Sequence, residues 1–287
     1  MTIALIGADG QLGSDLSRIL PSGRFTALNF PEFDVTRPGP VRQVIEALRP
    51  RVVINTAAYH RVDECEDEPL AALRVNALAV RDLALVCREV DAVLVHFSTD
   101  YVFDGRLGRP YTEEDAPHPL SAYAVSKLAG EHFLRSLWPK HFLVRTCGLF
   151  GEAGSKEKGT NFVESMISGA GAGRTLRVVS DQTVSPTATA ELAPRVLELV
   201  ESGAFGLYHM TNEGRCTWFE FARAVFDILG LSPDLQPVSS EVLGARARRP
   251  AYSVLENRAY NRLGLTPFSS WREALEAYLR RKGHLRG

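Results

Sequence analysis

The chain has 287 residues, of which 45% are hydrophobic and 23% charged, and its 33 basic and 34 acidic side chains leave a formal net charge of -1. A chain of this length buries a substantial core, as one large domain or two modest ones. The balanced charge argues against a protein that binds nucleic acid by neutralising phosphates. No apolar run reaches the roughly 18 residues of a membrane span, and no basic segment precedes the short apolar run at the start, so neither a membrane protein nor a secretory signal is expected.

The cysteines and histidines give no sign of disulfides or of a metal site. Four cysteines stand apart along the chain, at Cys65, Cys87, Cys147 and Cys216. Their spacing excludes a disulfide scaffold and a zinc ribbon, and no His-x-x-x-His pair supports a histidine zinc site. We therefore expect reduced thiols, a cytoplasmic protein and no required metal.

The first half of the chain alternates short apolar runs with amphipathic helical segments. The predicted strands cover residues 2–6, 25–28, 52–54, 93–97 and 142–146. The predicted helices cover residues 11–20, 41–48, 70–90 and 122–137. This rhythm indicates βαβ units and a parallel sheet, and the continuous apolar character of the strands indicates that helices cover both faces.

After Gly148 the rhythm changes. A loop rich in Gly, Ser, Lys and Glu covers residues 151–160, and a glycine-rich turn covers residues 169–173. Helices are predicted over 161–169, 190–201, 218–229 and 270–281, with one strand over 206–210. The predicted fold class is α/β, a Rossmann-type doubly wound parallel sheet. Residues 1–150 would form a dinucleotide-binding domain, joined by a returning segment near 188–230, and residues 151–187 and 231–287 a smaller substrate-binding region.

Three glycines follow the first predicted strand and open the first helix. Gly7, Gly10 and Gly13 have the spacing G-x-x-G-x-x-G. Glycine allows a tight turn and lets a pyrophosphate approach the helix N-terminus, where free N–H groups favour anions. The position between a strand and a helix favours dinucleotide binding over a purely structural turn.

The end of the second predicted strand does not settle which nicotinamide cofactor binds. An acid there selects NAD and a nearby arginine suits a 2'-phosphate, but the position is occupied by Asn29. NADPH and NADH therefore both stay open. Asp34 is either an acceptor for the adenine amino group or a solvated loop acid.

Tyr123 and Lys127 lie four residues apart on a predicted helix and therefore share a face. A cation beside a phenol stabilises the phenolate, which suits proton transfer during reduction of a ketone. Only five of the 33 basic residues are lysines, so a lysine at this position is more informative than usual. Thr99 ends the fourth strand, where ligands bind in an open parallel sheet, and can donate its hydroxyl to a carbonyl oxygen.

These residues resemble the extended branch of the short-chain dehydrogenase/reductase family. The matching features are the glycine pattern, residues 55–58, Asn76, Ser98-Thr99 and Tyr123-x-x-x-Lys127. Within that branch, residues 98–105, 181–187 and 249–257 resemble the dTDP-4-dehydrorhamnose reductase family. The resemblance implies NADPH- or NADH-dependent reduction of the C4 keto group of a dTDP-linked deoxyhexulose to dTDP-L-rhamnose.

The resemblance also implies roles for individual residues. Tyr123 would protonate the C4 alkoxide, Lys127 would lower the pKa of Tyr123 and hold the nicotinamide ribose, and Thr99 would bind the keto oxygen. The cofactor-binding candidates are Gly7, Gly10, Gln11, Leu12, Gly13, Asn29, Asp34, Val35, Ala57, Ala58, Tyr59, Ser98, Tyr123 and Lys127. The substrate-binding candidates are Thr99, Asp100, Tyr101, Arg174, Gln182 and Arg249. Arg174 and Arg249 are proposed because guanidinium groups suit phosphate oxygens, with a solvated basic stretch as the alternative.

The chain departs from this family at one position. The family often has a tryptophan after the fifth strand, where this chain has Gly148. Either another aromatic residue substitutes for it or the sugar specificity differs. Some family members bind magnesium at a dimer interface, for which Asp15 and Glu191 are the nearest candidates. Monomer and homodimer both stay open.

Two rival functions remain. A sugar-nucleotide dehydratase or epimerase has the same fold, but a dehydratase needs an acid and a carboxylate side by side after the threonine, where this chain has Asp100 and Tyr101. The regulatory β subunit of methionine adenosyltransferase also resembles these reductases. An assay of NADPH or NADH oxidation would discriminate between these functions.

Overall fold

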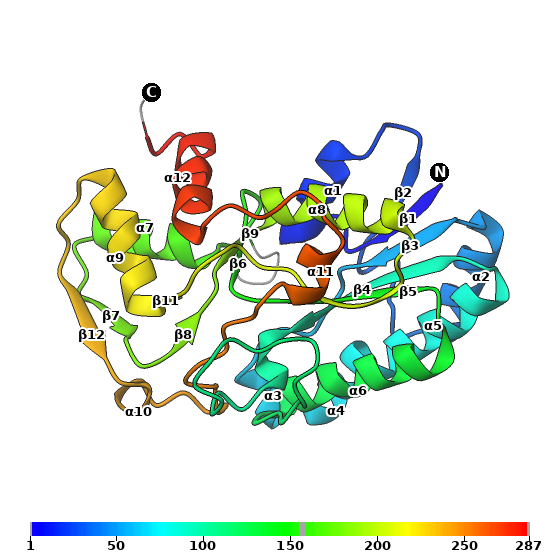
Figure 1. Ribbon diagram of the computed structural model, residues 1–287, viewed down its shortest axis with the longest axis horizontal. Helices are drawn as coiled ribbons and strands as arrows, with labels where there is room; N and C mark the ends of the chain where they lie inside the picture. The colour runs from blue at the N-terminus through cyan, green and yellow to red at the C-terminus, as the bar shows by residue number, and fades with distance from the viewer. Residues whose placement is uncertain (1, 155–158, 286–287) are drawn as a thin grey trace.

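A six-stranded parallel sheet forms the centre of the computed structural model, which describes residues 2–154 and 159–285. Its strand order is β10-β5-β4-β3-β1-β2 (Figure 1). The strands are β1 (Ile3–Ile6), β2 (Phe25–Leu28), β3 (Val52–Asn55), β4 (Val93–Thr99), β5 (His141–Thr146) and β10 (Gly206–His209). Every neighbouring pair is parallel. The predicted Rossmann-type fold class is confirmed.

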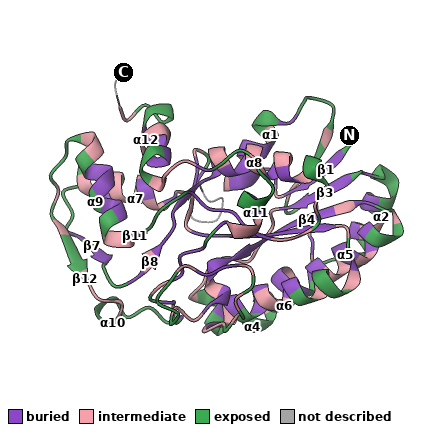
Figure 2. Ribbon diagram, viewed as in Figure 1, coloured by how far each residue is buried: buried purple, intermediate pink, exposed green. Residues whose placement is uncertain are grey.

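Helices cover both faces of this sheet. Helices α1 (Gln11–Ile19) and α8 (Thr189–Ser202) lie on one face, and α2 (Pro38–Leu48), α5 (Ala79–Glu89) and α6 (Ala122–Leu137) on the other (Figure 1). Leu16 and Val196 belong to the first apolar layer, and Ile45 and Leu83 to the second. All residues of β1, β3 and β5 are buried, as the purple sheet in Figure 2 shows. Burial on both faces explains their continuous apolar sequences.

The helix predicted over residues 70–90 changes its winding in the middle. It consists of α4 (Pro69–Leu73), a π-helical turn (Arg74–Leu78) and α5, after a short α3 (Glu64–Asp67). The side chain of Asn76 points inward from that turn and holds both the N–H and the C=O of Tyr59, at 2.9 Å each. A Cβ on Gly130 of α6 would lie 2.1 Å from the carbonyl oxygen of Asn76, so this glycine allows α6 to pack closely against the turn. π-turns of this kind are frequent at functional sites.

A second lobe packs against the open end of the sheet. It contains α7 (Phe162–Gly171), α9 (Trp218–Leu229) and α12 (Trp271–Arg281), which share an apolar core around Phe221 and Leu275 (Figure 1). Its short strands pair as β8 with β11, β7 with β12, and β6 with β9. These strands are β6 (Leu149–Phe150), β7 (Leu176–Val179), β8 (Thr183–Val184), β9 (Thr187–Ala188), β11 (Cys216–Thr217) and β12 (Leu235–Val238). The remaining regular elements within the described ranges are the small helices α10 (Ser240–Leu243) and α11 (Arg258–Arg262) and a short 3-10 helix (Asp100–Val102) directly after β4.

The second half differs from its prediction in several places: of its strands only β10 was predicted, and α10 and α11 were not predicted. Residues 169–171 are the last turn of α7 rather than part of a glycine-rich turn. A Cβ on Gly169 would lie 2.6 Å from Cδ2 of Leu176, so this glycine allows α7 to pack closely against β7. Helix α9 joins the second lobe, whereas α8 and β10 join the sheet. Of the loop predicted over 151–160, residues 155–158 lie outside the described residues.

Candidate active site

A cavity of about 1420 Å³ opens at the carboxyl ends of the sheet strands. We call it the main cavity. After β1, the chain forms β2 on one side of it and then β3 on its other side, so the strand order reverses beside β1. Crevices at such reversals are where open parallel sheets bind ligands. The second lobe closes the other side of the cavity, with Phe162, Gln182 and Trp218 among its lining residues.

The glycine turn forms one end of the main cavity. Gly7 has a φ of +75°, and a Cβ there would lie 2.7 Å from the hydroxyl oxygen of Thr56. Gly13 does not line the cavity; a Cβ on it would lie 2.0 Å from the carbonyl oxygen of Gly7, so its role is to let α1 close on the turn. Gly10, Gln11 and Leu12 do line it.

The start of α1 fits an anionic group such as a pyrophosphate. No side chain in the described part of the molecule caps α1, and no acid lies in its first turn. The buried Oε1 atom of Gln11 has no hydrogen-bond partner within the same ranges, while its Nε2 atom donates to the carbonyl oxygen of Leu149 at 3.1 Å. Free N–H groups at a helix N-terminus and their dipole stabilise a phosphate.

The expected adenosine side of the cavity is only partly as predicted. Asp34 and Val35 line it, but an oxygen of Asp34 already accepts hydrogen bonds from the N–H and hydroxyl of Thr36, at 2.9 and 2.7 Å. Asn29 is outside the lining, and its Oδ1 atom accepts from the N–H of Asp9 at 3.3 Å. Asn29 therefore steadies the glycine turn.

The loop after β3 lines the main cavity between its two ends. Ala57, Ala58 and Tyr59 all contribute to the lining. The clamp from Asn76 fixes the backbone of Tyr59, and Asn55 accepts a hydrogen bond from the N–H of Ala57 at 3.1 Å. The loop is thus held in a defined position against the space beside the glycine turn.

Thr99, Tyr123 and Lys127 meet in the same cavity. Thr99 ends β4 and donates its hydroxyl to Asp100 at 3.0 Å. Tyr123 and Lys127 lie in the first turns of α6, whose N-terminus is capped by Ser121. Burial raises the pKa of Tyr123, and a hydrogen bond with Thr99 opposes the rise. Tyr123 is therefore a neutral phenol, able to donate a proton.

The contacts of Lys127 differ from the expectation that it stabilises a phenolate of Tyr123 directly. Its ammonium donates to the carbonyl oxygen of Phe97 at 2.6 Å and lies 3.4 Å from Nε2 of His96. Burial lowers the pKa of Lys127 to about 8, and the charge of Glu131 opposes this shift. Burial also lowers the pKa of His96, so this ring is neutral. The sequence did not indicate His96 as a partner of Lys127, since a residue inside a buried strand usually only packs in the core.

A buried ion pair lies behind Ser98 and the first turns of α6. Glu131 of α6 accepts from Nε and Nη2 of Arg145 at 2.9 and 2.6 Å, and each side chain is 1% exposed. The hydroxyl of Ser98, predicted to contact the cofactor, lines the main cavity but donates to Glu131. Ser98 therefore connects the cavity wall to this ion pair.

Asp100 is held by both halves of the chain. Its carboxylate accepts from the thiol of Cys147 at 3.1 Å and from the hydroxyl of Ser253. Burial raises its pKa to about 6, while the hydrogen bonds from Ser253, Cys147 and Thr99 oppose the rise. Tyr101 follows it, with its ring edge-on to that of Tyr123 at 6.1 Å between centroids. The sequence did not reveal Ser253 or Cys147 as partners.

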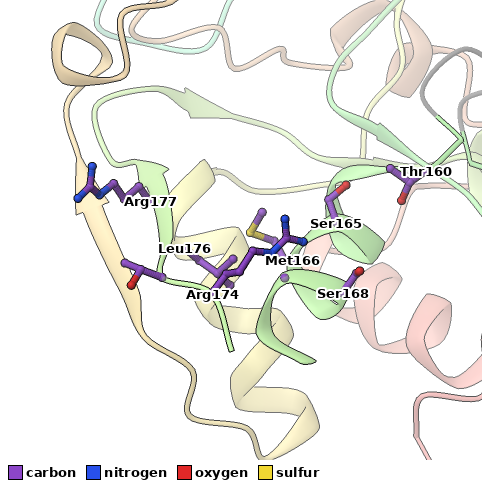
Figure 3. Close-up of a pocket in the computed structure, with 9 residues that line it drawn as sticks. Thr160, Ser165, Met166, Ser168, Arg174, Leu176 and Arg177 are labelled. Atoms are coloured by element: carbon purple, nitrogen blue, oxygen red, sulfur yellow. The ribbon is translucent and has the colours of Figure 1, made fainter. Parts of the chain in front are cut away.

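Of the three substrate-binding candidates in the second half of the chain, Arg249 and Gln182 line the main cavity and Arg174 does not. Arg249 lines the main cavity but forms an ion pair with Asp63 at 2.8 Å, and Gln182 donates to Ser240 at 2.7 Å. Arg174 is outside the main-cavity lining. It lines a neighbouring cavity of about 510 Å³ together with Arg177, and Figure 3 shows it near Met166 of α7.

Residues 1–283 match the family described as the RmlD substrate binding domain. The chain belongs to the RmlD substrate-binding-domain family. This RmlD-family chain is 41% identical over 286 residues to a dTDP-4-dehydrorhamnose reductase of Mycobacterium tuberculosis, covering 96% of this chain and 92% of the relative. It is 40% identical over 273 residues to a dTDP-4-keto-6-deoxy-D-glucose reductase of Streptomyces niveus, covering 94% and 93%.

A solved structure supports the same assignment of this RmlD-family chain. The crystal structure of a dTDP-4-dehydrorhamnose reductase from Bacillus anthracis in complex with NADP superposes with a TM-score of 0.92 at 37% identity. The match covers 98% of this chain and 100% of that one.

The two magnesium candidates of this RmlD-family chain are engaged elsewhere. Asp15 contacts Arg18 and Thr189, and Glu191 accepts hydrogen bonds from Asn212 and Ser269. Within residues 2–154 and 159–285, no group of three or more His, Cys, Asp or Glu side chains could hold a metal ion. In those same ranges no helix is long and apolar enough to cross a membrane.

Proposed function

We propose that this protein reduces the C4 keto group of dTDP-4-dehydro-6-deoxy-L-mannose to dTDP-L-rhamnose, with NADPH or NADH as the reductant. The observation that carries the proposal is that Thr99, Tyr123 and Lys127 line one cavity with the glycine turn of α1. Relatives named dTDP-4-dehydrorhamnose reductase and the NADP complex of the Bacillus anthracis structure support it.

The bound nicotinamide cofactor would supply a hydride to C4 of the sugar. When the substrate binds, the hydroxyl of Thr99 would exchange its hydrogen bond to Asp100 for one to the keto oxygen, which holds the carbonyl in place. Tyr123 transfers its phenolic proton to that oxygen as negative charge develops there, which leaves a phenolate. The Lys127 ammonium donates to the carbonyl oxygen of Phe97, so it would stabilise this phenolate through its charge rather than by direct contact, and it would hold the ribose hydroxyls of the bound cofactor. Gly10, Gln11 and Leu12 would hold the pyrophosphate.

The surroundings of Tyr123 suit a general acid. Burial keeps the phenol protonated, and the neighbouring carboxylate of Asp100 raises its pKa further. Tyr123 is therefore still protonated when the substrate binds, and it transfers its proton only when negative charge develops on the substrate oxygen. A dehydratase would need a second acidic group after Thr99, where Tyr101 stands. Elimination of water therefore lacks its base.

A second candidate is reduction of a related dTDP-4-keto sugar, such as dTDP-4-keto-6-deoxy-D-glucose. It is favoured by the name of the Streptomyces niveus relative and by Gly148, which leaves the cavity wall without a side chain. Both candidates use the same residues for hydride and proton transfer. They differ in the configuration of the ring carbons of the keto sugar that the cavity must accept.

The deciding experiment supplies the purified protein with each keto sugar in turn, together with NADH or NADPH. The loss of nicotinamide absorbance measures turnover, and product analysis identifies the sugar. Tyr123→Phe is the control, since it removes only the acidic hydroxyl. If cofactor binding is retained but neither sugar causes oxidation, the proposed function is wrong and a regulatory role gains support. We propose the cytoplasm as the site of action.

A further inference from the structure

We propose that Trp218 is the residue on which the hexose ring of the substrate stacks, and that it sets which sugars this enzyme accepts. The inference rests on the proposed function, because it places the reacting carbonyl at Thr99 and Tyr123. No sequence pattern pointed to Trp218. It stands at the start of α9 in the second lobe and lines the main cavity.

The ring of Trp218 lies against the bare backbone of Gly148. A Cβ on Gly148 would lie 3.3 Å from Cη2 and 3.8 Å from Cζ2 of that ring, which is close contact. Gly148 has a φ of +53°, a conformation that favours glycine over residues with a side chain. The absence of a side chain at 148 therefore gives the indole ring its place in the cavity wall.

This part of the wall adjoins the chemistry. Cys147 directly precedes Gly148, and its thiol contacts Asp100, the residue after Thr99. A substrate with its carbonyl at Thr99 brings its six-membered ring beside residues 147 and 148, and thus beside Trp218. The nucleobase is separated from that ring by a diphosphate and a ribose. The geometry therefore matches Trp218 to the hexose rather than to the base.

The surroundings of Trp218 hold its ring in a fixed orientation. Its centroid is 4.8 Å from that of Phe162, at an interplanar angle of 49°. The backbone N–H of Trp218 donates to the carbonyl oxygen of Gln182 at 3.3 Å, and Thr217 and Glu220 form a capping box, so the backbone that carries the ring is fixed at the start of α9. A rigid aromatic ring provides large contact area at little entropic cost. The C–H groups on one face of a pyranose match the electron-rich face of an indole.

The test compares the affinities of dTDP and dTDP-glucose, two stable probes that differ by the hexose ring. Binding is measured by calorimetry for the wild type, Trp218→Leu and Trp218→Phe. Trp218→Leu should weaken dTDP-glucose by about 3- to 10-fold and leave dTDP within about twofold, because only the stacking contact is lost. Trp218→Phe, which keeps a ring, should retain most of the affinity for dTDP-glucose.

Trp271→Leu is the matched control. Trp271 packs on Phe221 in the same lobe, at 5.8 Å between ring centroids, and is not part of the main-cavity lining. Trp271→Leu should leave the affinities for dTDP and dTDP-glucose unchanged. If Trp271→Leu weakens dTDP-glucose as much as Trp218→Leu does, a loosened second lobe explains the effect and the inference is overturned. Equal losses of dTDP and dTDP-glucose in Trp218→Leu would assign the ring to the base and also overturn it. If the wild type binds neither probe, the proposed function fails and the inference fails with it.

Discussion

Replacing Glu131 by methionine should strongly destabilise the protein, because it leaves Arg145 charged and buried without an acid. Both side chains are 1% exposed, and two of the guanidinium nitrogens donate to this carboxylate. The third, Nη1, is already buried without a partner in the described part of the chain. Removing one member of such a pair costs about 3–5 kcal/mol. At about 2 °C per kcal/mol for a chain of this size, Tm should fall by roughly 6–10 °C.

Urea unfolding followed by circular dichroism measures the loss of stability. The double variant Glu131→Met/Arg145→Met should be more stable than the single one, since apolar residues tolerate burial where an unpaired charge does not. Glu276→Met is the control, because it removes an exposed ion pair with Arg280 on α12 and should cost at most ~0.5 kcal/mol. A single variant that loses less than about 1 kcal/mol, or a double variant no better than the single, would refute this reasoning.

Three further predictions concern catalysis. Tyr123→Phe should lower kcat by about 100-fold or more with the affinity for NADPH unchanged, as stopped-flow and binding measurements would show; near-normal turnover would contradict its role as the acid. Because burial lowers the pKa of Lys127 to about 8, and a lysine is cationic only below its pKa, kcat should fall as the pH rises through about 8. In Lys127→Arg that alkaline limb should disappear from the pH profile, since a guanidinium stays charged; an unchanged limb would assign it to another group. Incubation with EDTA followed by desalting should leave turnover unchanged, and activity restored only by added magnesium would show that a metal is required.

The sequence was sufficient for the sheet and its helices because their signals are local. Phe25–Leu28, Ala122–Leu137 and Trp218–Leu229 begin and end where the hydrophobic pattern predicts. The short strands of the second lobe carry no such signal. Thr187–Ala188, for example, is a strand only because it pairs with Leu149–Phe150, and two residues are too few to show an alternating pattern.

The candidate site was predictable to the same extent. The spacing of Tyr123 and Lys127 on one helix and the position of Thr99 at a strand end are local features, and all three line the main cavity. Partnerships across the fold were not visible in the sequence. Arg249, expected to bind phosphates, forms an ion pair with Asp63 instead. Asp63 lies in the loop between β3 and α3 and Arg249 lies after α10, and these two segments come together only in three dimensions.

The position of β10 at the edge of the sheet affects how this protein is made. Residues 206–209 pair with β5, whose six residues are all buried in the finished fold. While the ribosome is still synthesising the second lobe, β5 therefore presents an unpaired apolar edge of the kind that recruits strands from other chains. A fragment ending near residue 150 would keep that edge permanently. We therefore expect a chain truncated near residue 150 to aggregate more readily than the full chain, in which β10 covers this edge.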